Sequence, residues 1–305
     1  MSYPDRKIQL RKHDGDWAAG FHAMASPCVA LTSGVDKTQT RKIAKLITKE
    51  VWRIQDKYSR YDPQSTLSRI NSRAGTPTRV DTETARLLDT AKQLYAASNR
   101  GFDITSGVLR KAWYFDGSDS LPEPAEVETL MHKVGWDKIQ WQSPMLHLRE
   151  NMEIDFGGIG KEYAADAALE RVRAQHQSPM LINLGGDICV SGPRQNQQPW
   201  LIGVENPGHP GTGNKVIELS SGALATSGTS HRFVRKNGMT YGHILDPRTG
   251  WPVVDAPLSV TVAAPTCSEA GMWATLAMLQ GALAETFLRQ ESGRQHWVKR
   301  CPPPH

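Results

Sequence analysis

The sequence lacks the features on which membrane-spanning and exported proteins depend. Its 305 residues contain no run of about 18 or more apolar residues, so no membrane span is expected. The N-terminal residues show no apolar stretch behind their basic side chains, and we therefore expect no secretory signal. The sequence thus predicts a cytoplasmic protein.

Cysteine is also scarce. The four cysteines are Cys28, Cys189, Cys267 and Cys301, and no two of them form a C-x-x-C pair. This spacing argues against a zinc site and against a disulfide framework. In a chain without an export signal we expect all four thiols to be reduced.

Positive charge is too small and too dispersed to indicate nucleic-acid binding. The chain has 36 Lys and Arg against 31 Asp and Glu, and no basic cluster is interleaved with aromatic residues. We therefore expect no nucleic-acid partner and only a weak preference for anions such as phosphates. With 39% hydrophobic residues, the chain can still bury a sizeable core.

Hydrophobic periodicity predicts both helices and strands. Apolar residues recur at helical spacing in 39–58, in 82–98, from 160 onward and in 267–280. Runs rich in Val, Ile and Leu predict strands at 27–32, 145–149, 152–156, 180–184, 187–190, 200–204, 215–219, 240–245 and 258–264. Because helices and strands do not alternate strictly, we expect an α+β fold with mixed or antiparallel sheets and packed helices.

The segment MEIDFGGIGKEYAADAALE (152–170) is the most informative stretch for chemistry. A strand is expected to end in Asp155, a glycine-rich turn follows, and a helix begins with Lys161 in its first turn. Glycines let backbone N–H groups approach an anion, and the helix N-terminus and the lysine add positive potential. The spacing excludes a Walker loop. Phosphate binding and a plain strand-to-helix turn both remain open from this segment alone.

A second stretch places a histidine near an aspartate. ALATSGTSHRF (223–233) is followed by TYGHILDPRTGWPV (240–253), in which a strand is expected to carry His243 and to end at Asp246. The two side chains could form an acid–base pair, but residues three apart on a strand face opposite sides. The alternative, favoured by these residues alone, is a turn held by Asp246 beside a partly buried histidine.

Two further segments combine aromatic and polar residues. FDITSGVL (102–109) is typical of an Asx-type turn that leads into a helix. In KYSRYDPQSTLSRIN (57–71), a tyrosine before the proline could stack on a flat ligand, although core packing is the commoner role.

Taken together, these segments resemble the ApbE family of flavin transferases. The motifs occur in the family's order: SRYDPQSTLSRIN (59–71), FDITSGVL (102–109), IDFGGIGKEYAAD (154–166), LINLGGDICVSG (181–192), ALATSG (223–228), HILDPRTGWPV (243–253), VTVAAPT (260–266) and ATLAMLQG (274–281). HILDPRTG after ATSG is the most telling. The resemblance covers roughly residues 20–285, and it divides the chain into an N-terminal extension (1–19), an ApbE-like flavin transferase domain (20–290) and a basic, Pro-rich tail (291–305).

The resemblance implies an FAD:protein FMN transferase. Such an enzyme takes FAD as its substrate, joins FMN by a phosphoester bond to a Thr or Ser of a client protein, and releases AMP. It also implies that FAD lies in a cleft between two parts of the chain, with His243 at the reacting phosphates. The residues that would contact FAD are Met24, Tyr61, Gly101, Phe102, Asp103, Asp155, Lys161 and Leu245.

The resemblance further implies a Mg²⁺ site. Its protein ligands would be the backbone carbonyl of Gly158, the side chain of Thr275, and an aspartate one helical turn before that threonine. This sequence has Gly271 at the aspartate position. Since Mg²⁺ prefers at least one carboxylate, we expect weakened metal binding.

Three arrangements remain open for position 271. FAD phosphates and waters could complete the metal site, a nearby carboxylate could enter it, or the protein could bind FAD without turnover. Glu269 is expected in a capping box with Thr266, and Ser268 would be a weak substitute ligand. Sequence alone predicts that Gly271→Asp is tolerated and lowers the Mg²⁺ requirement, because Asp has no worse helix propensity than Gly.

The predicted function is therefore transfer of FMN from FAD to a protein hydroxyl. One alternative is an FAD pyrophosphatase, in which water replaces the acceptor and FMN and AMP are released. The other is a catalytically weak flavin-binding protein, and Gly271 is the feature that favours it.

Overall fold

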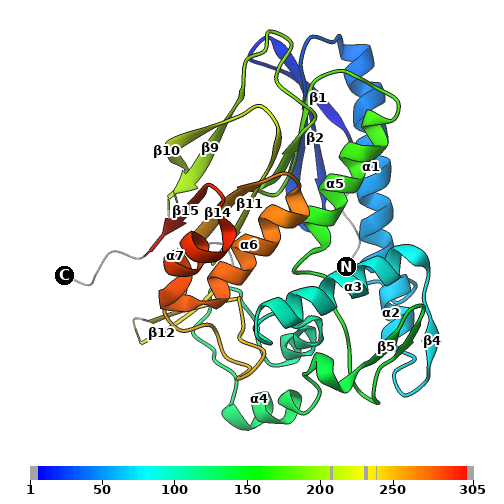
Figure 1. Ribbon diagram of the computed structural model, residues 1–305, viewed down its shortest axis with the longest axis vertical. Coiled ribbons are helices and arrows are strands. Elements are labelled where there is room, and N and C mark those ends of the chain that lie inside the picture. Colours follow the sequence, from blue (N-terminus) through cyan, green and yellow to red (C-terminus); the bar gives the residue numbers. More distant parts are fainter. Residues whose placement is uncertain (1–5, 207–208, 230–232, 238, 301–305) are drawn as a thin grey trace.

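The largest element of the fold is an eight-stranded antiparallel sheet. The computed structural model describes residues 6–206, 209–229, 233–237 and 239–300. The order across the sheet is β1–β2–β3–β7–β8–β11–β14–β15 (Figure 1). In chain order these strands are β1 (Gln9–His13), β2 (Asp16–Ala23), β3 (Ser26–Thr32), β7 (Met180–Leu184), β8 (Asp187–Val190), β11 (Gly222–Gly228), β14 (Ser259–Ala264) and β15 (His296–Lys299).

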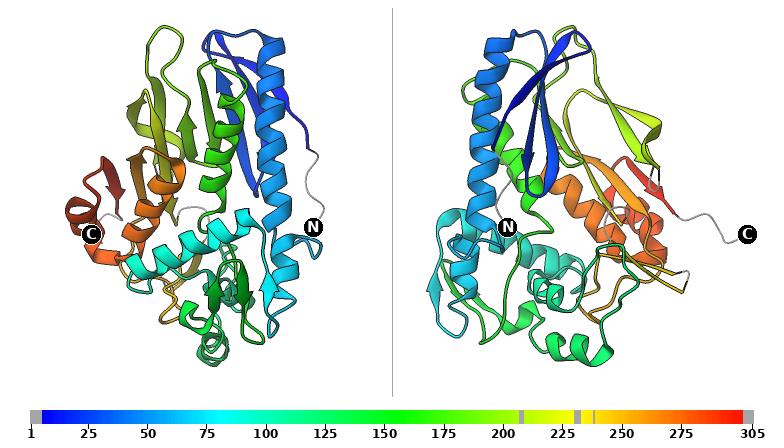
Figure 2. Two further views of the ribbon diagram at one scale, coloured as in Figure 1. Left: turned by 45° about the vertical axis from the view of Figure 1, so that its right-hand side comes forward. Right: turned by 180° about the vertical axis from the view of Figure 1, so that it is seen from behind.

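Three helices cover one face of the main sheet, as Figures 1 and 2 show: α1 (Lys37–Tyr58), α5 (Gly160–Arg173) and α6 (Cys267–Leu279). The apolar faces of the helices and the sheet meet in one buried cluster that includes Ile47, Ala168 and Ile182. The opposite face packs against the hairpin of β9 (Trp200–Asn206) and β10 (His209–Leu219), where Trp200 is buried against Val190 and its neighbours. The sheet is therefore apolar on both faces.

The segment between α1 and α5 forms a second part of the molecule, below the sheet in Figure 1. It contains α2 (Thr66–Asn71), α3 (Thr82–Ala97), α4 (Pro124–Met131), the 3₁₀ helices η1 (Ile104–Lys111) and η2 (Trp136–Lys138), and the sheet of β4 (Thr78–Arg79), β5 (Gln140–Gln142) and β6 (Met145–His147). Its core includes Ile159 and reaches Leu276 of α6. The remaining elements are β12 (Phe233–Lys236), β13 (Met239–Gly242), η3 (Gly281–Leu283), α7 (Ala284–Phe287) and the short π-helix η4 (Leu288–Ser292).

A half-buried carboxylate ties the two parts together. Glu83 of α3 accepts from Arg53 of α1 at 2.6 Å, from Lys57 at 2.7 Å and from the Tyr163 hydroxyl of α5 at 2.8 Å. The Arg53 hydrogen bond is the main cause that lowers the pKa of Glu83 to about 2. This cluster fixes the first turns of α5 relative to α1 and α3.

The α+β fold predicted from the sequence is confirmed, and so are its four long helices. One strand prediction is wrong, and two predicted strands end earlier than expected. Residues 152–156 form no strand, because their neighbours are α2 and η1 and the backbone of Ile154 bonds instead to the Asn71 side chain. The strand expected at 240–245 ends at Gly242, since Leu245 makes only an isolated bridge to Pro252. The strand expected at 145–149 stops at His147.

The ends of the chain contribute to the main sheet. Residues 9–19, assigned above to an N-terminal extension, form β1 and the first half of β2. Residues 296–299, assigned to the tail, form β15 and pair with β14. Residues 301–305 of the tail and 230–232 of the segment 223–233 lie outside the described residues.

Two findings over the described residues concern membrane-spanning helices and cysteines. Within them, no helix is both long and apolar enough to cross a lipid bilayer. Cys28, Cys189 and Cys267 are free, buried thiols.

We predict that Glu83→Gln destabilises the protein in a pH-dependent way. The folded-state pKa of about 2 lies below the ordinary value of 4.5, so the stabilisation is complete above pH 4.5 and is lost as the pH falls toward 2. At pH 7 the variant should lose about 1–3 kcal/mol, as expected for hydrogen bonds to a charged group. Urea unfolding between pH 7 and pH 3 measures this, with Glu128→Gln on the exposed face of α4 as control. A deficit that stays constant over this range would contradict the assignment.

Candidate functional site

The glycine-rich turn before α5 packs directly against η1. The backbone N–H of Asp155 donates to the carbonyl of Ile104 at 2.8 Å. A Cβ added to Gly107 would lie 2.5 Å from the Cβ of Asp155, and one added to Gly158 would lie 3.1 Å from the Phe102 ring. Glycine at these positions thus permits a close approach between the segments 101–107 and 155–160, both of which contain residues expected to contact FAD.

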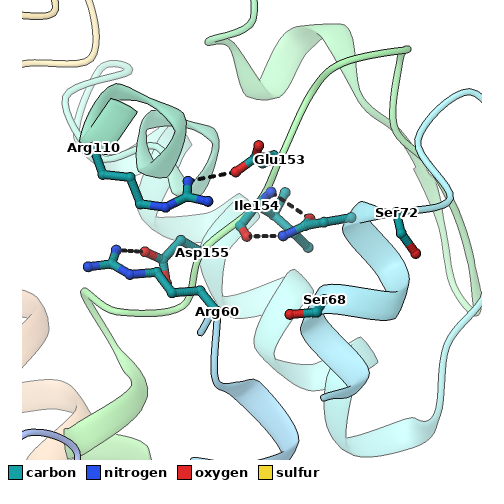
Figure 3. A pocket seen from close by; sticks show the side chains of 8 residues that line it. Arg60, Ser68, Ser72, Arg110, Glu153, Ile154 and Asp155 are labelled. Atoms are coloured by element: carbon teal, nitrogen blue, oxygen red, sulfur yellow. Dashed lines mark hydrogen bonds and ion pairs between the residues drawn. The ribbon is translucent and has the colours of Figure 1, made fainter. Parts of the chain in front are cut away.

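A polar pocket of about 240 Å³ opens beside Asp155 (Figure 3). Its lining residues are Arg60, Ser68, Asn71, Ser72, Arg110, Glu153, Ile154 and Asp155. The Asp155 carboxylate pairs with Arg60 and accepts from the backbone N–H of Gly157 at 2.9 Å. Arg60 in turn donates to the Tyr61 hydroxyl at 2.9 Å and stacks on its ring. Tyr61 is 63% exposed, so its ring is accessible to a ligand.

Asp103 is engaged within the protein itself. Its buried carboxylate accepts from the backbone N–H and the hydroxyl of Thr105 and from the N–H of Trp136, all at 2.7–2.8 Å. Burial raises its pKa. This is the Asx-type helix start that the sequence indicated, and it holds the preceding residues Gly101 and Phe102 beside the glycine turn.

Met24 lies at the tip of the β2–β3 hairpin, in a left-handed conformation with φ of 50°. Its backbone N–H donates to the Gln55 side chain of α1, and its own side chain packs on the helical core. The same hairpin meets the β7–β8 turn, since a Cβ on Gly185 would lie 2.7 Å from Ser26. Met24 is thereby placed at the end of the sheet where β8 begins.

Lys161 and Asp187 form a buried ion pair at that end of the sheet. The ammonium of Lys161 lies 3.2 Å from the carboxylate of Asp187, the first residue of β8, and the side chains are 31% and 4% exposed. The carboxylate of Asp187 raises the pKa of Lys161, which keeps the lysine charged. The lysine retains enough exposure for a further anionic partner.

Glu162, the next residue, carries a second buried carboxylate. The residue is 7% exposed, and within the described residues its Oε2 atom has no hydrogen-bond partner. Burial, followed by the nearby charge of Asp187, raises the pKa of Glu162 to about 8. The sequence reading missed this residue, although a Glu adjacent to Lys161 in a glycine-initiated helix was a visible signal.

Glu162 fills the space beside Gly271. A Cβ built on Gly271 would lie 2.6 Å from Cγ and 2.7 Å from Oε1 of Glu162. Gly271→Asp therefore requires the Glu162 side chain to move, and the expectation that the substitution is tolerated stays a prediction. Helix propensity, on which that expectation depended, does not register this tertiary contact.

The neighbours of Gly271 on α6 are also accounted for. Thr266 caps the helix by accepting from the N–H of Glu269, but the Glu269 carboxylate pairs with Arg294 and so does not complete the expected capping box. The Ser268 hydroxyl donates its hydrogen bond to the Asp166 carboxylate. Thr275, one turn after Gly271, lies 3.0 Å from the Ser227 hydroxyl of β11.

His243 and Leu245 lie on the segment that returns from β13 to the sheet. The His243 ring meets Phe115 edge-on at 6.3 Å, and Leu245 packs with the cluster around Trp113. Ile244 between them packs against the clusters that contain Ala274 and Leu276 of α6. Asp246 holds a turn by accepting from Arg248, in agreement with the turn alternative for that residue.

Comparison with known proteins now decides the family. The family model described as "ApbE family" matches residues 25–296, which is most of the chain. The chain belongs to the ApbE family.

Within the described residues, no group of three or more His, Cys, Asp or Glu side chains could hold a metal ion.

Relatives in this family share both sequence and fold with the chain. It is 29% identical over 245 residues to an FAD:protein FMN transferase of Salmonella typhimurium, covering 76% of this chain and 70% of that protein. It is 27% identical to an FAD:protein FMN transferase of Vibrio cholerae, over 85% and 81% of the two chains. The ApbE protein of Thermotoga maritima superimposes with a TM-score of 0.84 at 28% identity, over 93% and 94% of the chains.

Proposed function

We propose that this chain transfers the FMN moiety of FAD to a Thr or Ser hydroxyl of a client protein. In this reaction the hydroxyl oxygen forms a bond to the FMN phosphorus, the bond from that phosphorus to the AMP phosphate breaks, and AMP leaves. The observation that carries the proposal is the match to the ApbE family over residues 25–296, whose relatives are named FAD:protein FMN transferases.

The arrangement of the glycine turn and α5 supports this function. The first backbone N–H groups of a helix attract anions, and α5 begins at Gly160 without a side-chain cap. Lys161 adds a full positive charge at the same place. We assign the pyrophosphate of FAD to this helix start, because phosphoryl transfer depends on charge neutralisation and positioning.

The residues expected to contact the rest of FAD surround this helix start. Phe102 borders the glycine turn, and Asp155 lines the polar pocket. Tyr61 contacts Arg60 of that pocket, and Met24 lies at the end of the sheet where Lys161 and Asp187 meet. We assign an accessible aromatic wall to Tyr61 and an apolar contact to Met24. Gly101, Asp103 and Leu245 remain proposed contacts, with Asp103 acting through the backbone that it positions.

A Mg²⁺ ion fits the residues present beside the helix start. Two observations support this fit. The buried Oε2 atom of Glu162 has no hydrogen-bond partner among the described residues, and the Glu162 side chain occupies the space beside Gly271. Gly158 and Thr275 are the proposed carbonyl and hydroxyl ligands. When bound, the ion would neutralise charge on the phosphate oxygens.

The decisive experiment separates transfer from hydrolysis and from binding. The purified chain is incubated with FAD and Mg²⁺, with and without the acceptor protein of the Vibrio cholerae relative, and AMP and covalently bound flavin are measured. We expect covalent flavin on the acceptor and AMP release that depends on it. AMP release without acceptor would indicate a pyrophosphatase, and FAD binding without AMP release would indicate a flavin-binding protein.

We predict that His243→Ala lowers the rate of FMN transfer by about 100-fold or more, as expected for loss of a general acid–base group. The dissociation constant for FAD should change little, because the phosphate-binding residues are untouched. Transfer rates and flavin fluorescence titrations measure the two quantities. His132→Ala, at an exposed position after α4, is the matched control. A variant that transfers at the wild-type rate would assign His243 to a structural role.

A further inference from the structure

Helices α5 and α6 lie antiparallel in a register that their contacts define. The carboxylate of Asp166 accepts from the backbone N–H groups of Cys267 and Ser268, each at 2.8 Å. One turn earlier on α5, Glu162 meets Gly271, one turn later on α6. Four residues advance a helix by about 6 Å, so both contacts follow one continuous seam.

Extending this seam by one more turn along α6, from 267 through 271, leads to Thr275. Gly158 lies in the turn that enters α5, two residues before the helix begins at Gly160. Residues four apart on a helix share a face, so Thr275 lies on the side of α6 that faces Glu162. The Ser227 contact of Thr275 places that hydroxyl at the sheet side of the seam.

Along the seam, Glu162 is the carboxyl group whose Oε2 atom lacks a hydrogen-bond partner within the described residues, although the charge of Lys161 acts on it. Asp166 is neutralised by the N-terminus of α6 and the Ser268 hydroxyl, and Asp187 is paired with Lys161. Glu162 is only 7% exposed, and its Oε2 atom has no hydrogen-bond partner within the described residues. Burying a polar atom without a hydrogen-bond partner is costly, so Oε2 of Glu162 is suited to a ligand such as a cation.

We propose that Glu162 supplies the carboxylate ligand of the Mg²⁺ site, in place of the aspartate that position 271 lacks. The proposal rests on the flavin-transfer function above. Glycine at 271 is then the complement of glutamate at 162, because any Cβ there would overlap the Glu162 side chain. One carboxylate, a carbonyl, a hydroxyl, substrate phosphates and water form a ligand set that Mg²⁺ accepts.

Exchanging the two positions tests this directly. Mn²⁺ serves as the probe for Mg²⁺, its free form is counted by electron paramagnetic resonance, and ADP serves as a pyrophosphate that carries no flavin. We expect Glu162→Gln to weaken Mn²⁺ binding by about tenfold or more, since a charged ligand is lost. The double variant Glu162→Gly with Gly271→Asp should restore binding to nearly the wild-type affinity. Glu50→Gln, a buried carboxylate on α1 paired with Arg53, is the control and should bind as wild type.

Each outcome decides the proposal. Wild-type affinity in Glu162→Gln, or a double variant that folds but does not regain binding, would overturn it. FMN transfer is measured on the same samples. Transfer by a wild-type chain whose Mn²⁺ affinity does not depend on Glu162 would overturn the ligand assignment and leave the proposed function standing. Mn²⁺ binding that depends on Glu162, without any FMN transfer, would support the ligand assignment and contradict the proposed function.

A second measurement uses the unaltered chain, in case Glu162→Gln does not fold. Fe²⁺ with ascorbate and peroxide cleaves a backbone close to the bound ion, and the fragments are identified by mass spectrometry. We expect cleavage near residues 158–162 and 271–275 that added Mg²⁺ suppresses. Cleavage only elsewhere, or cleavage at this place that Mg²⁺ does not suppress, would contradict the proposal.

Discussion

The contact between the start of α5 and the middle of α6 is the constraint on which the rest of the site depends. It exists because Gly271 has no side chain, so the Glu162 side chain can lie against the α6 backbone. Its neighbour Lys161 is then directed to Asp187 on β8, at the end of the main sheet. A helix start, a helix face and a strand end are thus joined by three consecutive positions, 160–162.

Close backbone approaches position the other elements around this contact. The glycine turn can lie on η1 only because Gly107 and Gly158 leave room for Asp155 and Phe102. The Glu83 cluster fixes α1, α3 and α5 relative to one another from the opposite side. These contacts link segments that are far apart in the sequence, which explains why the characteristic motifs of the chain are distributed along its whole length.

Much of the fold could be predicted from the sequence, because its signals are local. The four long helices and about half of the described strands follow from periodicity and from bounding glycines, as at β7 and β8. Residues 152–156 have the composition of a strand but are held by the Asn71 side chain, and composition does not reveal that partner. The strands β1, β2, β11 and β15 of the main sheet were not predicted, and neither were the short strands β4, β5 and β12, because their alternation of apolar residues is weak.

The candidate site was predictable in its members but not in its pairings. The motifs named Lys161, Asp155 and His243, yet nothing in the order of residues shows that Lys161 faces Asp187 or that Arg60 faces Asp155. The same limit applies to Glu162 and Gly271, which are distant in sequence and touch only in the fold. A helix-propensity argument at position 271 therefore leaves out the contact with Glu162.

The most direct test of this account is the position of a metal ion in crystals grown with Mn²⁺ and ADP. Anomalous diffraction at the manganese absorption edge locates the ion without reference to the protein. The account predicts one peak within bonding distance of the Glu162 carboxylate, with the Gly158 carbonyl and the Thr275 hydroxyl as further ligands. A peak away from Glu162, or crystals with ADP bound and no peak beside that carboxylate, would contradict it.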